Sequence, residues 1–433
     1  MTENSSQEVN QVPLGNDLAS WLTYIEALHP KSIEMGLARV KKVFDQLHIQ
    51  LKCPVITVGG TNGKGSTCAI LERIYTEAGY RVACYSSPHF IQFNERIRIN
   101  LQNADDATIV AAFQAIESAR IDTQLTYFEF STLAAFWIFS KQNIDVAILE
   151  IGLGGRLDAV NVIESNCAIV TSIDLDHMDY LGATREKIGF EKAGIYRANI
   201  PAICGDTHPP KTLSDYAAHI QADYLPINQA FQVEIKQDTW NYVFDQATFK
   251  ALPKPALKGA FQIENAACVL TAITKLQTLL PVSEEAIHQG LLNVRLLGRF
   301  QQIKQQPSVL VDVAHNPHAA FSLAHNLASS VVSGKTIAVF AMLADKDING
   351  VILAVGAQID AWYIATIATM RGANAQILQQ AIKENYPTKP VYLHESIVQA
   401  YESACLQAGE NDRIIAFGSF YTVAAVLQVK ACN

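Results

Sequence analysis

The chain has 433 residues, of which 49% are hydrophobic and 17% are charged, and its formal net charge is −8. A chain of this length exceeds the size at which one hydrophobic core usually stops growing, so two or more domains are expected. The negative charge, without a cluster of Lys and Arg, excludes a nucleic-acid partner, because binding a phosphate backbone requires a basic face.

The eight cysteines are scattered without a CxxC pair. This usage fits a reducing compartment and indicates neither a disulfide framework nor a zinc site. The N-terminal residues are polar and acidic, unlike a signal peptide, and charged or amide residues interrupt the longest apolar stretches. We therefore expect a cytoplasmic protein without a membrane partner.

The first half of the chain alternates predicted helices and strands. Residues 18–47 predict two helical segments that break near His29 and Pro30. Strands are expected at 53–58, 81–85, 144–151 and 168–173, and helices at 67–78 and 130–141. Strands that alternate with helices predict a mostly parallel sheet with both faces covered. Residues 221–250 then change to alternating, aromatic-rich segments, which predict a small antiparallel sheet.

The remaining residues predict a second α/β unit. Helices at 263–279 and 283–292 precede strand candidates at 308–313, 336–342, 361–365, 390–393 and 413–417. The α/β pattern restarts after residues 293–304, where Gly298 permits a bend, so this segment is the expected hinge. We predict an α/β protein of two domains, 1–297 and 298–433. The first carries a phosphate loop and both sheets, and the second is Rossmann-like without a phosphate loop.

That loop is the glycine-rich turn Val-Gly-Gly-Thr-Asn-Gly-Lys-Gly-Ser-Thr at residues 58–67. Glycines let backbone N–H groups surround a polyphosphate, the helix N-terminus adds positive potential, Lys64 supplies a charge, and a hydroxyl can ligate magnesium. Gly65 separates Lys64 from Ser66, so the loop is a variant of the common pattern. An ordinary glycine turn that caps a helix is the alternative. The lysine, the hydroxyls and the preceding strand together favour a nucleoside triphosphate site.

Glu150 lies at the end of the predicted strand 144–151, just before a glycine-rich turn. Ligands of parallel sheets gather outside the carboxyl ends of the strands, where the phosphate loop must also lie. A carboxylate there can hold magnesium against the γ-phosphate, whereas its alternative role is to cap the next turn. The phosphate loop favours the magnesium interpretation.

His177 follows the predicted strand 168–173, and its place at a strand end makes a ligand and a structural histidine equally good interpretations. Lys192, in Glu-Lys-Ala-Gly, has the sequence context of a solvated helix lysine. Nothing in its neighbours singles it out.

Seven segments carry a resemblance to a known family. They are Gly60-Thr-Asn-Gly-Lys-Gly-Ser, Tyr85-Ser-Ser-Pro-His, Leu125-Thr-Tyr-Phe-Glu, Leu149-Glu-Ile-Gly-Leu-Gly-Gly-Arg-Leu-Asp-Ala, Asp176-His, Glu191-Lys-Ala-Gly-Ile and Asp312-Val-Ala-His-Asn-Pro. These segments occur in the same order in the bacterial bifunctional dihydrofolate synthase/folylpolyglutamate synthases, which the chain therefore resembles. That family is related to the Mur peptide ligases. The resemblance implies a Mur-ligase-like ATPase domain followed by a glutamate-ligase domain.

The resemblance also implies a nucleotide site and a catalytic set. The positions expected around ATP are Thr61, Asn62, Gly63, Lys64, Gly65, Ser66, Thr67, Asn265, Arg299, Asp312 and His315. Two Mg²⁺ ions are implied, one held by Ser87 and Glu150, the other by Glu150, His177 and a carbamylated Lys192. A carbamate is the hard oxygen ligand that magnesium prefers. Lys64, Glu150, His177 and Lys192 form the implied catalytic set. For Arg299, the alternative interpretation is a solvated arginine in the linker.

By the same resemblance, the pterin is expected near Ile33, Thr126, Tyr127, Phe128, Glu129, Leu157, Asp158 and Ala159. Phe128 would stack on the ring and Asp158 would accept from its amino group, although aromatic residues also serve as core. L-glutamate is expected near His315 and Ser419.

The implied reaction activates a carboxylate with the γ-phosphate of ATP and captures the acyl phosphate with the amine of L-glutamate. 7,8-dihydropteroate would give dihydrofolate, and reduced folates would give polyglutamates. A monofunctional folylpolyglutamate synthase, a Mur-type peptide ligase and a non-catalytic ATP-binding module are the alternatives. The chain has no room for the extra N-terminal domain of a Mur-type ligase, and a switch would not need the full catalytic set. The resemblance further implies a monomer that K⁺ stimulates.

Overall fold

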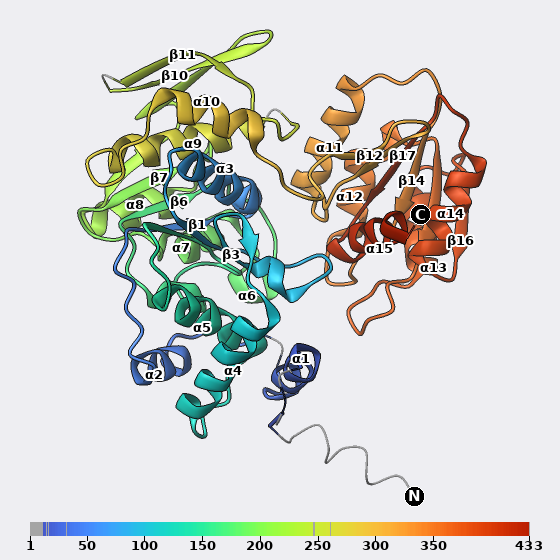
Figure 1. The fold of residues 1–433 in the computed structure, drawn as a ribbon. Coiled ribbons are helices and arrows are strands. Elements are labelled where there is room, and N and C mark those ends of the chain that lie inside the picture. The colour runs from blue at the N-terminus through green and yellow to red at the C-terminus, as the bar shows by residue number, and fades with distance from the viewer. Residues whose placement is uncertain are drawn as a thin grey trace, which may run out of the picture. The chain divides into compact units, whose positions relative to one another are not determined.

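The computed structural model describes residues 12–13, 15, 17–31, 33–245, 247–259 and 261–432, and the side chains of these residues up to 429. The chain forms two compact units, both visible in Figure 1. The first contains residues up to 254 together with 263–294, and the second contains residues 255–262 together with those from 295 onward.

An eight-stranded sheet forms the centre of the first unit, in the order β4-β3-β2-β5-β1-β6-β7-β8. Its parallel strands are β1 (Val55–Gly59), β2 (Val82–Tyr85), β5 (Val146–Glu150), β6 (Cys167–Val170), β7 (Pro201–Cys204) and β8 (Asp223–Pro226). At one edge, β3 (Ile97–Ile99) and β4 (Gln102–Asn103) continue it as antiparallel strands. This largely confirms the predicted mostly parallel sheet.

The register of the central strands decides where the site lies. Val58 of β1 pairs with Glu150 of β5 on one side and with Ile169 of β6 on the other. The three strands run in the same direction, so the segments that follow them leave the sheet at one edge. These segments are the glycine-rich turn, the turn after Glu150, and the loop that contains His177.

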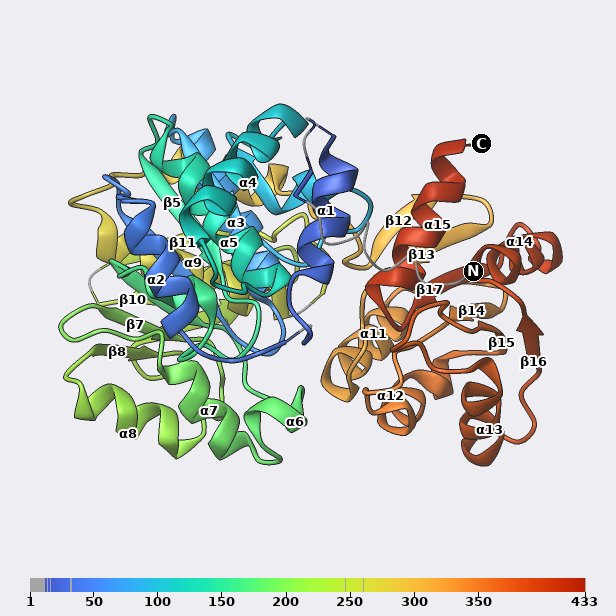
Figure 2. The same cartoon turned by 90° about the horizontal axis from the view of Figure 1, so that it is seen from below.

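Helices cover both faces of this sheet. They are α1 (Leu18–Ala27), α2 (Ala38–Gln46), α3 (Lys64–Glu77), α4 (Asp106–Arg120), α5 (Tyr127–Ser140), α6 (Met178–Leu181), α7 (Arg185–Ala193), α8 (Lys211–His219), α9 (Phe261–Leu276) and α10 (Glu284–Asn293), with the short 3₁₀ segments η2 (Phe93–Arg96) and η3 (Ala159–Val162). Figures 1 and 2 show α4 and α5 side by side, with α1 and α2 against them. Apolar residues of α1, α2 and α4 to α8 are buried with those of the sheet in one core.

A three-stranded antiparallel sheet completes the first unit, formed by β9 (Phe231–Ile235), β10 (Thr239–Phe244) and β11 (Ala247–Pro253). Trp240 and Tyr242 are buried whereas Val243 is exposed, and the Tyr242 hydroxyl bonds Thr271 of α9 at 2.9 Å. The predicted antiparallel sheet is therefore confirmed for these strands. For residues 223–226 the prediction is wrong, because this segment pairs in parallel with β7.

The second unit has a six-stranded sheet in the order β12-β13-β17-β14-β15-β16. Its strands are β12 (Gln301–Lys304), β13 (Ser308–Val311), β14 (Thr336–Phe340), β15 (Ala361–Ala365), β16 (Val391–His394) and β17 (Arg413–Phe417); all pairs are parallel except β12 with β13. Its helices are α11 (Pro317–Ser329), α12 (Ile348–Val355), α13 (Ala375–Asn385), α14 (Ile397–Gln407) and α15 (Phe420–Cys432), with the 3₁₀ segment η4 (Gly356–Gln358). The second α/β unit and its five strand candidates are confirmed.

Two helix starts correct the sequence analysis. The helix after the glycine-rich turn begins at Lys64 rather than at residue 67, and the helix predicted from residue 130 begins at Tyr127. In the first case, Gly65 and Ser66 have the composition of a loop, although they lie in the first turn of the helix. In the second, Thr126 and Glu129 cap each other, since each side chain accepts from the backbone N–H of the other.

Within the part of the chain that the structure describes, no helix is long and apolar enough to cross a membrane. The seven cysteines with described side chains are all free.

Candidate active site

The glycine-rich turn lies in a space that only glycine fits. A Cβ on Gly60 would lie 1.9 Å from the Thr171 hydroxyl oxygen, and a Cβ on Gly63 would lie 2.6 Å from Asn265 Oδ1. Both glycines have positive φ, and Gly63 caps the N-terminus of α3. The first-turn N–H groups of a helix have no acceptor within the helix, so they are available for a phosphate.

The loop that follows β6 holds this turn in place. Thr61 N donates to Ser172 O at 2.7 Å, and the Thr61 hydroxyl donates to Asp174 O and accepts from Asp174 N. The Thr171 hydroxyl donates to Asn62 O at 2.6 Å. Sequence reasoning missed Thr171 and Ser172 in this role. The available signal was a pair of hydroxyl residues directly after a buried strand.

Lys64 bends back over the same turn. Its Nζ donates to Gly60 O at 3.1 Å and to Thr61 O at 3.2 Å. These neutral carbonyl partners hold the ammonium above the phosphate loop without neutralising its charge. A phosphate there would meet a positioned cation.

Glu150 is 4% exposed at the carboxyl end of β5. Its Oε2 accepts a hydrogen bond from the backbone N–H of Ser87 at 3.3 Å. Ser87 follows the neighbouring strand β2. The structure therefore brings these two predicted metal ligands together. A buried carboxylate and a hydroxyl are suitable oxygen ligands for Mg²⁺.

Lys192 lies in the last turn of α7 and is 3% exposed, so the interpretation as a solvated helix lysine is wrong. A glycine in the turn after β5 allows this burial, because a Cβ on Gly155 would lie 2.8 Å from Glu191 O and 3.0 Å from Lys192 O. Burial, reinforced by Lys64 and partly opposed by Asp176 and Asp158, lowers the pKa of Lys192 to about 7. A substantial fraction of the amine is then neutral near pH 7, which is the form that reacts with CO₂.

His177 is the N-cap residue of α6 and has a φ of +51°. Its Nε2 lies 3.9 Å from Asp176 Oδ2. Among the described residues, no three His, Cys, Asp or Glu side chains group closely enough to hold a metal ion. A carbamate on Lys192 would add an oxygen ligand to the carboxylate of Glu150 and the imidazole of His177.

Apart from Ile33, the residues predicted around the pterin lie on two neighbouring segments of the first unit. A Cβ on Gly152 would lie 2.5 Å from Phe128 Cζ, so the Phe128 ring lies against the turn that contains Leu157 and Asp158. Asp158 caps η3 by accepting from Val160 N, and it also accepts from Leu153 N in the turn after β5; Ala159 is buried beside it. Burial raises the pKa of Asp158 to about 7 despite these hydrogen bonds.

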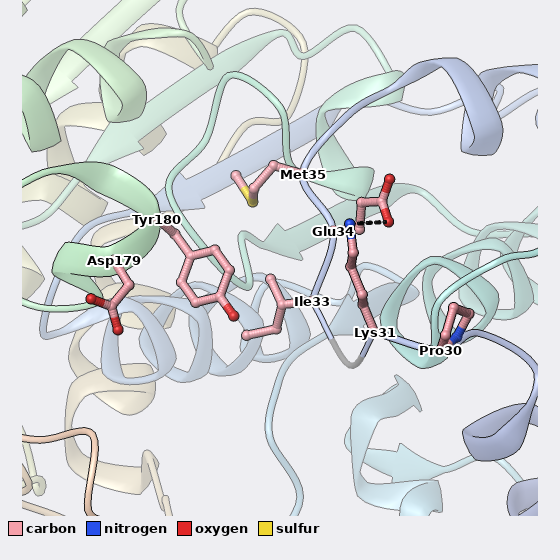
Figure 3. A pocket seen from close by; sticks show the side chains of 7 residues that line it. All are labelled: Pro30, Lys31, Ile33, Glu34, Met35, Asp179 and Tyr180. Carbon is pink, nitrogen blue, oxygen red and sulfur yellow. Dashed lines mark ion pairs between the residues drawn. The ribbon is translucent and has the colours of Figure 1, made fainter.

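Ile33 lines a pocket of about 600 Å³. Figure 3 shows its side chain next to that of Tyr180 of α6, with Lys31 and Glu34 at the other end. The predicted pterin residues Thr126 and Glu129 are instead 3% exposed and cap α5.

The second unit holds its own group of predicted residues. The Arg299 guanidinium lies 5.6 Å from the centroid of the Phe420 ring, and the His315 ring lies 6.3 Å from the same ring. Asp312 accepts from the N–H groups of Phe300 and Ala314, and burial raises its pKa. Ser419 is 3% exposed, and its hydroxyl accepts from Thr422 N at the start of α15.

Two protein families match this chain. The Mur ligase middle domain matches residues 58–273, and the glutamate ligase domain of Mur ligases matches residues 298–420. The dihydrofolate synthase/folylpolyglutamate synthase of Escherichia coli is 42% identical over 413 residues, which cover 95% of each chain. The chain belongs to the dihydrofolate synthase/folylpolyglutamate synthase family.

Solved structures of this family have the same fold. The E. coli FolC complex with DHPP and ADP is 42% identical, with a TM-score of 0.91 over 96% of this chain and 98% of that one. A bifunctional folylpolyglutamate synthase/dihydrofolate synthase with Mn, AMPPNP and L-glutamate bound is 41% identical, with a TM-score of 0.89 over 97% of this chain and 99% of that one. The resemblance and the two-domain, Mur-ligase-like fold predicted from the sequence are confirmed.

Proposed function

We propose that this chain is an ATP-dependent ligase that adds L-glutamate to 7,8-dihydropteroate and to reduced folates through an acyl phosphate. The observation that carries the proposal is the fastening of the phosphate loop to the loop of His177, at the sheet edge where Glu150 also lies. A nucleotide and a metal ion would meet there. The bifunctional relatives support both activities; a monofunctional folylpolyglutamate synthase is the alternative.

The phosphate loop would bind ATP through the backbone of Thr61–Thr67 and through Lys64. The cation above the loop would stabilise the charge that develops on the transferring phosphoryl group. Asn265, which lies against Gly63 in the first unit, is positioned to hold the loop or the nucleotide. We propose Arg299, Asp312 and His315, which belong to the second unit, as further nucleotide-binding residues.

Two Mg²⁺ ions would lie at this edge of the sheet, one held by Ser87 and Glu150, the other by Glu150, His177 and carbamylated Lys192. When bound, the ions would neutralise charge on the phosphates. The buried amine of Lys192 fits this proposal, because burial favours the neutral amine that reacts with CO₂, and the carbamate would add an oxygen ligand to that of Glu150. Lys64 and these ligands would form the catalytic set.

The pterin would lie between Phe128 and the 157–159 turn, with Ile33 lining the pocket. In this proposal Asp158 accepts a hydrogen bond from the ring amino group. Thr126, Tyr127 and Glu129 would shape the pocket at the start of α5. L-glutamate would be held near His315 and Ser419.

The functional division would follow the two units, with residues 1–297 as the ATP-binding domain, 298–433 as the glutamate-ligase domain, and a hinge at about 293–304. The units divide between residues 294 and 295, which supports this position, although residues 255–262 group with the second unit. We also propose that the protein is cytoplasmic, because the described cysteines are all free. From the family resemblance we further propose that it is a monomer and that K⁺ stimulates it.

One assay tests the proposal. The protein is incubated with Mg²⁺, ATP and labelled L-glutamate, with either 7,8-dihydropteroate or tetrahydrofolate, and both label incorporation and ADP release are followed. We expect incorporation with both pterins. Incorporation with tetrahydrofolate alone would establish the monofunctional alternative, and ATP turnover without any incorporation would reject the ligase.

A further inference from the structure

Residues 28–37 join α1 to α2 and supply most of the pocket that Ile33 lines; we refer to them as the 28–37 loop. Outside residue 32, which is not among the described residues, the loop contains neither helix nor strand. Lys31 Nζ pairs with Glu34 Oε2 at 3.4 Å along one side of the pocket (Figure 3). Without a backbone ladder, the shape of the loop depends on such side-chain contacts.

Arg39, near the start of α2, joins this loop to a second element. On one side its guanidinium donates to Glu34, at 3.1 Å to Oε1 and at 2.9 Å to the backbone oxygen. On the other side it donates to Glu129, at 3.0 Å to Oε1 and at 3.4 Å to Oε2. A planar guanidinium can make these directional bonds at once, whereas a lysine ammonium cannot reproduce them.

Glu129 is a rigid anchor for this bridge. Its side chain is 4% exposed, compared with 25% for Arg39, and its Oε2 also accepts from Thr126 N at 2.8 Å. Because Glu129 is fixed by the capping of α5, Arg39 fastens the 28–37 loop to the first turn of that helix. That turn contains Tyr127 and Phe128, two residues of the proposed pterin site.

The same loop is also tied to the other side of the proposed site. Gly36 N donates to Leu157 O at 3.2 Å. Met35 approaches the neighbouring turn, because a Cβ on Gly154 would lie 3.5 Å from Met35 Cε. The 28–37 loop is thus held against both segments between which the pterin would lie.

We propose that Arg39 is a positioning residue for the pterin substrate, an inference that rests on the proposed function. All four of its side-chain hydrogen bonds go to Glu34 and Glu129, so its effect is on the pterin pocket and not on the phosphate loop. It holds the 28–37 loop in the shape that receives the ring.

The test measures dissociation constants for 7,8-dihydropteroate and for AMPPNP with Mg²⁺, together with kcat, KM and Tm, in the full-length protein. Arg39→Met removes both sides of the bridge but leaves the buried Glu129 carboxylate without this partner, which costs stability. The double variant Arg39→Met/Glu129→Gln avoids that charge, and Glu129→Gln alone is its reference. Lys41→Met, on the same helix with an exposed ion pair to Asp45, is the matched control.

We expect at least a tenfold increase in the dihydropteroate Kd and KM of Arg39→Met relative to wild type, and of the double variant relative to Glu129→Gln. The AMPPNP Kd should stay within twofold, Arg39→Lys should be intermediate, and Lys41→Met should match wild type. If the double variant folds and binds dihydropteroate like Glu129→Gln, or if only Tm and kcat fall, Arg39 is merely structural and the inference is overturned. If wild-type protein itself binds no pterin, the proposed function fails, which is a distinguishable result.

Discussion

At the scale of single residues, the molecule places two lysines in opposite environments. Lys64 is half-buried with carbonyl oxygens as its partners, whereas Lys192 is buried so deeply that its pKa falls to about 7. The first is suited to a phosphate and the second to reaction with CO₂. The sequence predicted the role of Lys64 from the glycines around it. It could not predict the burial of Lys192, because that depends on Gly155, which is distant in sequence.

Replacing Lys64 by alanine should remove the cation that stabilises the transferring phosphoryl group. We expect Lys64→Ala to lower the rate of ADP formation by roughly 100-fold or more, in line with losses of single electrostatic groups in active sites. Tm should change little, since the lost hydrogen bonds are to half-buried carbonyls. A variant with wild-type ADP release would refute the role of Lys64.

Lys192→Ala should inactivate the enzyme, and small carboxylates such as formate or acetate should partly restore activity, because they can supply the missing oxygen ligand. Lys192→Met, in which the longer side chain fills the space, should resist this rescue. Wild-type rates in Lys192→Ala would contradict the proposed carbamate.

The pH dependence of carbamylation follows from the same pKa. Below about 7 the amine is protonated and does not react with CO₂; above it the amine is neutral. In enzyme depleted of bicarbonate, the rate of reactivation at fixed dissolved CO₂ should therefore rise by about tenfold between pH 6 and pH 8. The carbamate itself is measured by NMR with ¹³C-labelled bicarbonate. A reactivation rate that is flat over this range would contradict the lowered pKa.

At the scale of elements, strands predicted from apolar runs were confirmed wherever the run was buried on both faces, as in β1, β5, β14 and β17. The sequence analysis missed β12, whose residues are mostly polar and only partly buried, because an edge strand needs no continuous apolar run. It also placed two helix starts too late, since capping by Thr126 and the helical turn at Lys64 depend on backbone geometry rather than periodicity.

A glycine sets the distance between α10 and the helix that follows the phosphate loop. A Cβ on Gly290 would lie 2.3 Å from Ile74 Cγ1 and 2.8 Å from Ile74 Cα. Helix propensity favours alanine over glycine by about 1 kcal/mol, but the contact with the backbone of α3 opposes it. We expect Gly290→Ala to lower the free energy of unfolding by about 1–3 kcal/mol, as overpacked cores do.

Chemical denaturation measures this change. The exposed neighbour Gln289→Ala, on the same helix, should alter the free energy of unfolding by no more than about 0.5 kcal/mol. A Gly290→Ala variant as stable as Gln289→Ala would show that α3 and α10 can separate at no cost.

At the scale of the whole molecule, the phosphate loop and the order of the motifs were enough to predict the family, the two-domain fold and the ligase activity. The parallel sheet explains why this works, because residues as far apart in sequence as Lys64, Glu150 and His177 lie at the ends of neighbouring strands or in the segments that follow them. What the sequence could not predict is how the loops are fastened. The contacts of Thr61 with Ser172 and Asp174, and of Arg39 with Glu34 and Glu129, join segments with no shared pattern.

The transfer of ¹⁸O from substrate to phosphate tests the central claim most directly. Dihydropteroate labelled in its carboxylate is incubated with the enzyme, Mg²⁺, ATP and L-glutamate, and the released inorganic phosphate is analysed by mass spectrometry. If the carboxylate attacks the γ-phosphate and glutamate then displaces phosphate, each phosphate should contain one oxygen from the carboxylate. Dihydrofolate formed together with unlabelled phosphate would contradict an acyl-phosphate mechanism.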